Sequence, residues 1–263
     1  MRPKQVCITG RGLDQDRIWM CVEAEPSPTD SGPAHTFISA RKDPNLLQIQ
    51  ATPTNQGVRL ERPGANPLHV SLPDHQSPVD PKSDLSVCIW GGVARAPAPC
   101  AKADAWVSNA LGRPARLVYA GPSFHRPINP NIGTPSETLT FVDGGPILLV
   151  GQTSLDDLNS RLSDPVSLEH FRPNLVVGGS EPYAEDEWTQ INIGPVQLIA
   201  GWPCARCVLV TRDPATGLQS PLREPLRTLA TYRTRDQAIN FGMNVRVKKG
   251  GVVKLGDPVQ VFR

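Results

Sequence analysis

The residue types best suited to chemistry lie in one short stretch of the chain, Pro203-Cys204-Ala205-Arg206-Cys207. A thiolate is the form of cysteine that binds metals, and a neighbouring guanidinium favours that form. An apolar, β-branched run over residues 208–211 follows the pair and predicts a buried strand, which a turn at 213–217 would end. We therefore expect Cys207, with Arg206 beside it, to be the chemical centre of the protein.

Three other interpretations of the cysteine pair stay open at this point. A zinc ribbon needs a second pair at suitable spacing, whereas the other four cysteines are isolated: Cys7, Cys21, Cys88 and Cys100. A thioredoxin-like motif follows a strand and opens a helix, whereas this pair is expected to precede a strand. Two inert, buried thiols are the remaining alternative, because free cysteine is among the most buried residue types.

The composition indicates a folded, β-rich protein and excludes several other classes. The 263 residues, of which 39% are hydrophobic, suffice for two domains or one large unit. The 28 prolines and 22 glycines divide the chain into many short segments, as all-β folds require. A net charge of +2 gives no electrostatic basis for binding nucleic acid or an anionic membrane. Cysteine usage predicts a reduced, cytoplasmic protein, and we expect neither a signal peptide nor a membrane span.

Three short helices are expected among the strands. The first, over 101–111, ends at Gly112 and places Ala105, Trp106, Ala110 and Leu111 on one face. The second, over 155–162, repeats leucine at helical spacing, with Thr153 or Ser154 as its cap. A third covers 225–232. The expected strands are 6–8, 18–22, 37–40, 46–50, 58–61, 68–72, 87–90, 117–119, 146–150, 175–177, 191–193, 196–199, 240–245, 252–255 and 259–261.

This pattern predicts a mainly β protein with a few short helices, in the α+β class and rich in β-barrel. A proline-rich linker over 121–138 marks the domain boundary. Few polar groups stand out elsewhere. On spacing alone, Asp16-Arg17 before the strand at 18–22 is a solvated ion pair, and His69 is exposed on the polar phase of its strand. His75 in the loop at 73–84 has no visible partner.

Seven motifs in the second half occur in the order and near-spacing of a MOSC domain. They are 143–149 (DGGPILL), 154–159 (SLDDLN), 171–177 (FRPNLVV), 185–188 (EDEW), 204–207 (CARC), 213–217 (DPATG) and 256–259 (GDPV). A weaker match at 11–13, 16–20 and 39–44 is similar to the N-terminal β-barrel domain that accompanies MOSC domains. The chain thus resembles the amidoxime-reducing component family and its bacterial relatives, which implies a smaller N-terminal β-barrel domain over 1–122 and a MOSC β-barrel domain over 138–263.

The resemblance also implies a cofactor and the residues that hold it. The cofactor would be molybdenum bound to molybdopterin, with Cys207 as the sulfur ligand of the metal. Arg17, Arg172 and Arg206 match positions that hold the anionic phosphate and dithiolene of the pterin, for which a guanidinium fork is suited. Asp143 and Asn174 match polar positions that line the same cavity, and Cys204 would be a packing neighbour. On this reading Arg17 is functional rather than part of a solvated pair.

The function that follows is that of an oxidoreductase, a molybdenum-dependent N-reductase. Its substrates would be small N-oxygenated compounds such as amidoximes, hydroxylamines or N-oxides. Electrons would come from a cytochrome b5-like haem protein or a flavin reductase, because the chain has no dinucleotide-binding fingerprint and no CxxCH haem motif. The alternatives are a cofactor carrier or sulfur-transfer module related to the C-terminal domain of molybdenum cofactor sulfurase, and a cofactor-free degenerate member. The family also carries an association with pyridoxal phosphate, but this chain has no room for the sulfurase's pyridoxal-phosphate domain.

One departure from the family pattern concerns the N-terminus. Relatives begin with a strand carrying a Tyr-Pro-x-Lys-Ser-like segment whose lysine and serine contact the cofactor, and Lys4 is not in register with it. We expect the strand at 6–9 to be too short to cover the barrel edge, leaving unpaired backbone groups there. The family's membrane anchor is not seen in this chain, so we expect a cytoplasmic location, or a mitochondrial one if the N-terminus is truncated.

Overall fold

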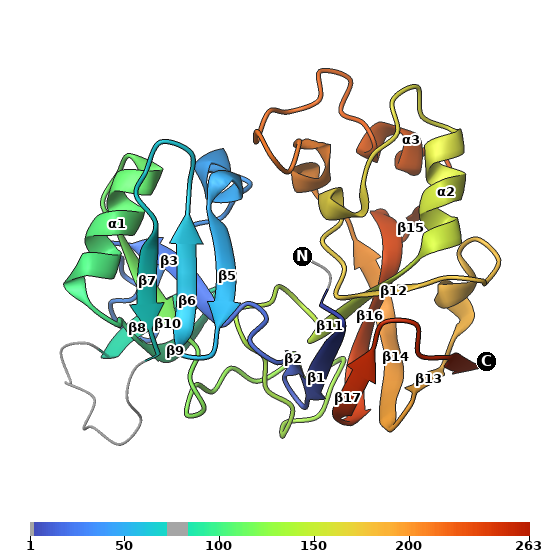
Figure 1. Ribbon diagram of the computed structural model, residues 1–263, viewed down its shortest axis with the longest axis horizontal. Coiled ribbons are helices and arrows are strands. Elements are labelled where there is room, and N and C mark those ends of the chain that lie inside the picture. The colour runs from blue at the N-terminus through green and yellow to red at the C-terminus, as the bar shows by residue number, and fades with distance from the viewer. Residues whose placement is uncertain (1–2, 73–83) are drawn as a thin grey trace. The chain divides into compact units, whose positions relative to one another are not determined.

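The computed structural model describes residues 3–72 and 84–263, and these form two compact units (Figure 1). The N-terminal unit comprises residues 17–126 with 215–217, and the C-terminal unit comprises residues up to 16, 127–214 and 218–263. Most of the elements are strands, as predicted, and none of the described helices is long and apolar enough to cross a membrane. His75 lies outside the described residues.

The N-terminal unit consists of small sheets and one α-helix. Strand β3 (Trp19–Glu23) pairs with β10 (Ala115–Tyr119), while β5 (Gln50–Thr54), β6 (Gly57–Glu61) and β7 (Leu68–Ser71) form an antiparallel meander. A third sheet joins β4 (His35–Thr36), β8 (Asp84–Ile89) and β9 (Gly92–Pro97). The apolar core lies between the meander, β10 and the helix. The exposed His69 imidazole, predicted to be solvated, contacts the Thr54 hydroxyl at 3.0 Å.

The helix of this unit, α1 (Ala101–Leu111), has the predicted bounds and ends at Gly112, whose φ of +68° places it in the left-handed region. Its buried face differs from the predicted one, because Ala103 and Val107 are buried while Ala105 is exposed. The true face follows the i, i+4, i+7 and i+8 spacing that a helix presents to a core.

Two predicted strands of this unit are absent from the described residues. Residues 46–50 belong mostly to a 3₁₀ helix, η1 (Pro44–Gln48), because Asp43 caps the Asn45 N–H and Pro44 fixes a helical φ at the first position. Residues 37–40 form only a single bridge, between Phe37 and Val22. Leu46 and Ile49 of the first segment still pack against the apolar core as half-buried side chains.

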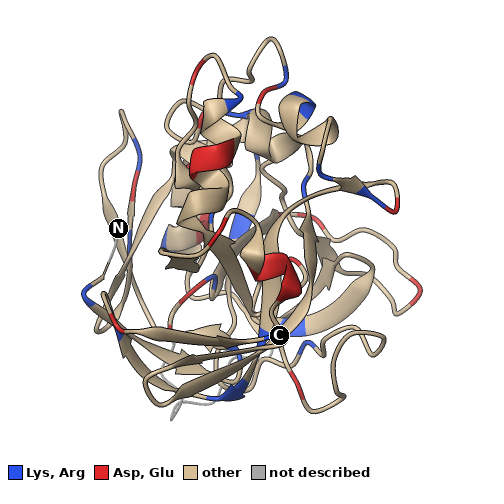
Figure 2. Cartoon of the chain, turned by 90° about the vertical axis from the view of Figure 1, so that its right-hand side faces the viewer, with Lys and Arg blue, Asp and Glu red and all other residues tan. Residues whose placement is uncertain are grey.

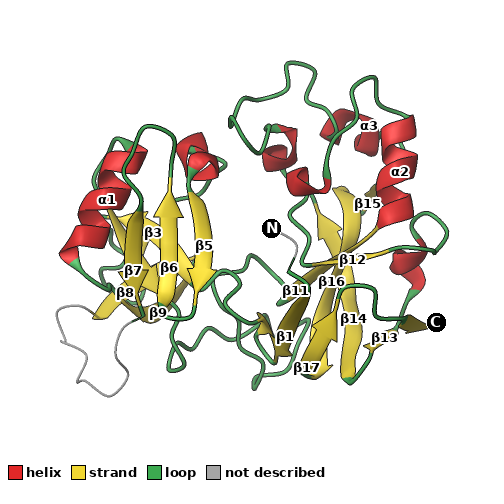
Figure 3. Cartoon of the chain, viewed as in Figure 1, coloured by secondary structure: helices red, strands yellow, loops and turns green. Residues whose placement is uncertain are grey.

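The C-terminal unit is built on one larger sheet (Figure 3). The strands follow the order β12 (Leu175–Val177), β11 (Ile147–Gly151), β16 (Ala238–Lys249), β14 (Val196–Ala205), β13 (Gln190–Ile193) and β18 (Val259–Phe262), with β15 (Thr234–Arg235) added to β16. Only β11 and β12 are parallel. One face buries an apolar cluster, at whose centre Ile147, Leu149, Ile191 and Leu198 are completely buried.

Helices cover a second apolar cluster of this unit. Helices α2 (Gln152–Ser160) and α3 (Leu226–Ala230), together with η2 (Leu168–His170) and η4 (Val208–Thr211), pack Leu155, Leu158, Val210 and Leu229 around Phe241. The predicted leucine face of α2 is therefore correct. Its predicted cap is wrong, because Gly151 is the N-cap and the Ser154 side chain is buried within the first turn.

The N-terminal segment pairs with strands of the C-terminal unit. Strand β1 (Gln5–Thr9) pairs with β17 (Gly251–Lys254) along residues 5–8 and with β2 (Gly12–Leu13) through Ile8 and Thr9. By these pairings the first sixteen residues pack with the C-terminal unit, and the N-terminal unit begins at Arg17.

The expected linker at 121–138 is partly a folded segment. The division between the units falls after Arg126. Beyond it, Ile128 is buried and its N–H donates to the Glu137 carbonyl. The Glu137 carboxylate pairs with Arg246 of β16 at 2.9 Å. This proline-rich segment contains no named helix or strand, yet it packs against the rest of the C-terminal unit.

Candidate functional site

Cys207 lies between the end of β14 and the 3₁₀ helix η4, where its φ of −110° and ψ of 177° are extended. The strand predicted over 208–211 is wrong, since the strand β14 contains Cys204 and ends at Ala205, and the apolar run is a 3₁₀ helix. The last hydrogen bond between this part of the chain and β16 runs from the Arg206 N–H to the Ile239 carbonyl. The Val210 N–H then donates to the Cys207 carbonyl, which begins the helical turn. The Thr211 hydroxyl donates to the Val208 carbonyl and closes the turn. The burial of Val210 is compatible with a strand or a turn, and in the turn the backbone groups find hydrogen-bond partners.

The two cysteines lie in different elements. Cys204 belongs to β14, and Cys207 comes directly before η4. The register of β14 against β16 shifts between Pro203 and Ala205, so the regular alternation of side chains is broken at Cys204. Both thiols are free, and no three potential metal ligands lie together among the described residues.

The predicted distinction from a thioredoxin-like motif is wrong, because the pair lies at the end of a strand and before a helical turn. A zinc ribbon would need two further ligands beside the pair, and the described residues place no such group together. Neither thiol is fully buried. The role of Cys207 as a metal ligand stays a prediction.

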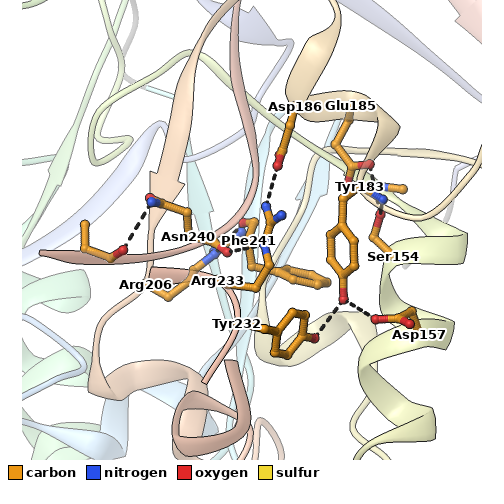
Figure 4. Close-up of polar contacts among 12 residues, drawn as sticks. Ser154, Asp157, Tyr183, Glu185, Asp186, Arg206, Tyr232, Arg233, Asn240 and Phe241 are labelled. Atoms are coloured by element: carbon orange, nitrogen blue, oxygen red, sulfur yellow. Dashed lines mark hydrogen bonds and ion pairs between the residues drawn. The ribbon is translucent and has the colours of Figure 1, made fainter. Parts of the chain in front are cut away.

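Arg206 is held by main-chain carbonyl groups (Figure 4). Its Nε donates to the Phe241 oxygen at 2.8 Å and its Nη1 to the Phe171 oxygen at 3.1 Å. Its guanidinium also lies 5.4 Å from the centre of the Phe171 ring. Arg206, which precedes Cys207, is thus bonded to Phe171, which precedes Arg172.

Glycine is required where β16 passes this arginine. Gly242 has a φ of +75°, and a Cβ there would lie 2.7 Å from the Leu149 oxygen and 3.4 Å from Arg206 Nη2. The register of β14 against β16 shifts at the same place, between Pro203 and Ala205. This bulge lets the backbone of β16 present the Phe241 carbonyl to the guanidinium.

Arg172 and Asn174 lie on the loop that enters β12. Arg172 is exposed and has a φ of +54°, a conformation uncommon for a residue with a Cβ. Asn174 is fixed in place: its Oδ1 accepts from the Leu148 N–H at 2.9 Å and its Nδ2 donates to Asp16 Oδ2 at 2.8 Å. Asn174 therefore cross-links β11 to the N-terminal segment of the same unit.

Asp143 and Cys204 are close enough to interact electrostatically. Burial is the main cause that raises the pKa of the Cys204 thiol, and the Asp143 carboxylate raises this pKa further, while Arg206 lowers it. Asn244 of β16 also lowers this pKa, and the Cys207 thiol raises it. Gly145 lies against Asn244, and a Cβ at Gly145 would approach the Asn244 Cβ to 2.9 Å. Asp143 itself is exposed.

Arg17 is the one predicted site residue assigned to the N-terminal unit, where its φ is +49°. The other five predicted residues, Asp143, Arg172, Asn174, Arg206 and Cys207, all belong to the C-terminal unit. Asp16, predicted as half of a solvated pair, is instead half-buried and accepts from Asn174. The role of all six residues in binding a cofactor stays a prediction.

A polar network behind Arg206 was missed by the sequence analysis (Figure 4). The Tyr183 hydroxyl donates to Asp157 Oδ2 at 2.7 Å and lies 2.7 Å from the Tyr232 hydroxyl. Burial and these two partners raise the pKa of Tyr183 far above its usual range. The Tyr183 and Phe171 rings both pack against Phe241, so the network continues to Arg206.

A second buried group supports the same region. The Glu185 carboxylate is fully buried and accepts from the Gly151 N–H at 3.0 Å and the Ser154 hydroxyl at 2.9 Å. A carboxylate at the N-terminus of α2 is favoured by the helix dipole. Next to it, Asp186 pairs with the buried Arg233 at 2.7 Å. Glu185 and Asp186 are thus structural: Glu185 fixes α2 against β11, and Asp186 holds Arg233, which donates to the Asn240 carbonyl of β16.

Comparisons with known proteins agree with this architecture. The model of the MOSC domain matches residues 136–260, and that of the MOSC N-terminal beta barrel domain matches residues 1–114. Mitochondrial amidoxime-reducing component 1 of Homo sapiens is 32% identical over 262 residues, covering 94% of this chain and 73% of the human protein. The chain belongs to the MOSC family of the amidoxime-reducing components.

Two further relatives differ in how much of their length this MOSC protein matches. Mitochondrial amidoxime reducing component 2 of Rattus norvegicus is 34% identical over 266 residues, covering 94% of this chain and 73% of the rat protein. Molybdenum cofactor sulfurase of Oryza sativa subsp. japonica is 37% identical over 259 residues, but the match covers 29% of the sulfurase. The MOSC protein is thus similar to most of one kind of relative and to a minor part of the other.

Proposed function

We propose that this MOSC protein is a molybdenum-cofactor-dependent oxidoreductase that reduces N-hydroxylated compounds. The observation that carries the proposal is the Arg206 bridge, which joins the half-buried thiol of Cys207 to the loop of the exposed Arg172. A single thiol and a guanidinium are matched to a soft metal ligand and a phosphate. The names of the human and rat relatives, both amidoxime-reducing components, support the same reaction.

The donor set fits the cofactor that the family implies. Cys207 would bind the metal through sulfur, and Arg172 would bind an anionic group of the pterin. Asn174 is held in place by its bonds to Leu148 and Asp16, so it would shape the site through its position. Arg206 would hold the Cys207 backbone in place. When bound, the molybdenum centre supplies two-electron oxygen-atom chemistry, and the protein supplies binding and orientation.

The overall reaction fixes what else is needed. Reduction of an amidoxime to an amidine consumes two electrons and two protons and releases water, with cleavage of the N–O bond. The electrons would come from a separate redox protein, a cytochrome b5-like haem protein or a flavin reductase. The substrates would be small amidoximes, hydroxylamines or N-oxides.

The test is to produce the chain in a host that makes the cofactor and to measure molybdenum per chain together with reduction of an aromatic amidoxime by a chemical electron donor. We expect about one metal per chain and turnover that Cys207→Ser abolishes. Cys204→Ser is the matched control and should keep both. Purified wild-type protein without molybdenum would contradict the proposal and indicate a cofactor-free member.

A carrier or sulfur-transfer module is the second candidate, because the identity to the rice sulfurase is 37%. Such a module would bind the cofactor through the same residues and would not reduce N–O bonds. Molybdenum without reductase activity towards any of the three substrate classes would favour this candidate over the first.

A further inference from the structure

A groove of about 560 Å³ opens in the C-terminal unit between the two ends of its larger sheet. Residues 176–181, which include the end of β12, form one wall, and residues 256–259 with Val261 and Arg263 form the other. Ala184 and Trp188 lie between them. The volume is in the range of ligand-binding clefts. The residues that line the groove differ from those around Cys207.

Both walls carry an open strand edge. Strands β12 and β18 are the terminal strands of the sheet, and each pairs with one neighbour among the described residues. Backbone N–H and C=O groups on such an edge are a template for another strand. Neither β12 nor β18 contains a charged residue, which is one usual protection of an edge.

Apolar side chains are exposed beside these edges. Val176 is 43% exposed, Val261 38% and Phe262 39%. Large apolar side chains gathered around a groove and rimmed by polar groups mark an interaction site. In the groove itself, Val177 and the almost completely buried Trp188 continue this apolar surface.

The charged groups around the groove are mostly acidic. Glu181 and Asp257 line it, and Glu187 follows on η3 (Ala184–Glu187), which Figure 2 shows in red beside the C-terminal end. Arg263 is the opposing cation, and its contact to Glu187 is a long one of 3.6 Å between two exposed side chains. The Ser180 hydroxyl, another lining group, has no hydrogen-bond partner among the described residues. The groove therefore favours a ligand with hydrogen-bonding groups and positive charge.

We propose that this groove binds an extended peptide segment of a partner protein, in which apolar and basic residues alternate, as an added strand on the open edge of β18. The apolar side chains of the segment face Val176, Val177 and Trp188. Its lysine or arginine side chains face Glu181, Asp257 and Glu187. The inference does not depend on the proposed oxidoreductase function, since no residue of the Cys207 site takes part.

The sharpest variant fills the groove without disturbing the backbone. Gly178 lies in the groove, has no positive φ, and a Cβ there would meet nothing within 4 Å. Gly178→Phe should therefore fold and occupy the space of the peptide. Gly10 meets the same two conditions in the turn between β1 and β2, so Gly10→Phe is the matched control.

The probe is the acetylated, amidated peptide Lys-Val-Lys-Val-Lys-Val, titrated into the full chain while backbone amide shifts are recorded by NMR. We expect saturable shifts confined to residues 175–188 and 256–263, with a Kd below about 1 mM. Gly178→Phe and a peptide with glutamate in place of lysine should each weaken binding by about tenfold or more, whereas Gly10→Phe should not.

Three results would overturn the proposal. The first is no saturable shift at a peptide concentration of about 1 mM. The second is unchanged affinity in Gly178→Phe, which would place the peptide elsewhere. The third is equal binding of a peptide whose alternate amides are N-methylated, because such a peptide cannot donate along one edge and would not be acting as a strand.

Discussion

Arg206 donates through Nη1 to the carbonyl oxygen of Phe171 at 3.1 Å, and this bond connects two loops that are 35 residues apart in the sequence. One loop presents Cys207 and the other presents Arg172. The second bond of the same guanidinium, to the Phe241 carbonyl, fixes both loops to the bulge in β16. The geometry of the candidate site therefore depends on a residue whose observed bonds are to backbone.

The first prediction separates the two cysteines. Cys207→Ser should remove bound molybdenum and amidoxime reduction, because an alcohol is a poor replacement for a soft thiolate ligand. Cys204→Ser should retain most of both, since Cys204 packs within β14, where burial raises the pKa of its thiol and disfavours the thiolate. Metal analysis of both purified variants is the measurement. Equal losses would show that the two thiols act together.

The second prediction concerns Arg206. Arg206→Lys keeps the charge but cannot make both carbonyl bonds, so the free energy of unfolding should fall by about 1.5–3 kcal/mol, the contribution of a hydrogen bond to a charged group. Molybdenum retention should fall with it. Denaturant titration of the cofactor-free protein gives the first quantity. If the lysine variant were as stable as the wild type and lost only the cofactor, Arg206 would be an anion ligand and not a positioning residue.

The third prediction concerns Arg172, which is exposed. Arg172→Ala should leave the free energy of unfolding nearly unchanged and weaken cofactor retention by about tenfold or more, the equivalent of one charge-assisted bond. Arg223→Ala is the control, because Arg223 is also exposed and also has a positive φ, of 58°. Retained molybdenum is compared after matched dialysis. Loss of folding in Arg172→Ala alone would indicate a structural role.

The fourth prediction tests the bulge. Gly242→Ala should destabilise the protein by about 2–4 kcal/mol, the sum of a left-handed non-glycine residue and an overpacked contact. The new Cβ would lie 2.7 Å from both the Leu149 oxygen and Val150 Cγ2. Gly256→Ala has the backbone strain without the contact, since its φ is +90° and a Cβ there meets nothing within 4 Å, so it should cost about 1 kcal/mol. Thermal unfolding of both variants separates the destabilisation by backbone strain from the destabilisation by the close contact.

The fifth prediction is a pH dependence. The hydrogen bond from Arg161, the largest cause, and that from Tyr183 lower the pKa of Asp157 in the folded protein. A lowered folded pKa stabilises the protein above the unfolded pKa of about 3.9, and this stabilisation is lost as the pH falls through the folded value. Asp157→Asn should therefore flatten the unfolding free energy between about pH 5 and pH 3. Urea titrations across this range measure it, and an unchanged slope would contradict the assignment.

The helices and strands that could be predicted from the amino-acid sequence are those whose pattern lies in neighbouring residues. The helix at 101–111 carries its own glycine end signal, and the leucines at 155, 158 and 162 face the core as their spacing requires. Alternating strands such as β6 and β7 were found because the pleat alone sets their pattern. The ordered motifs also identified the family, which the comparisons confirm.

The backbone around the site depends on pairing between distant segments. The apolar run at 208–211 would be buried as a strand or as a turn, and its pairing with β16 ends at Ile239, after which the turn forms. Spacing could not show that Cys204 lies on a strand beside a register shift while Cys207 precedes a helical turn, because both placements depend on β16. Nor could it show that the Arg206 side chain bonds two carbonyl groups. Those carbonyls belong to Phe171 and Phe241, and such distant partners meet only when the sheet has formed.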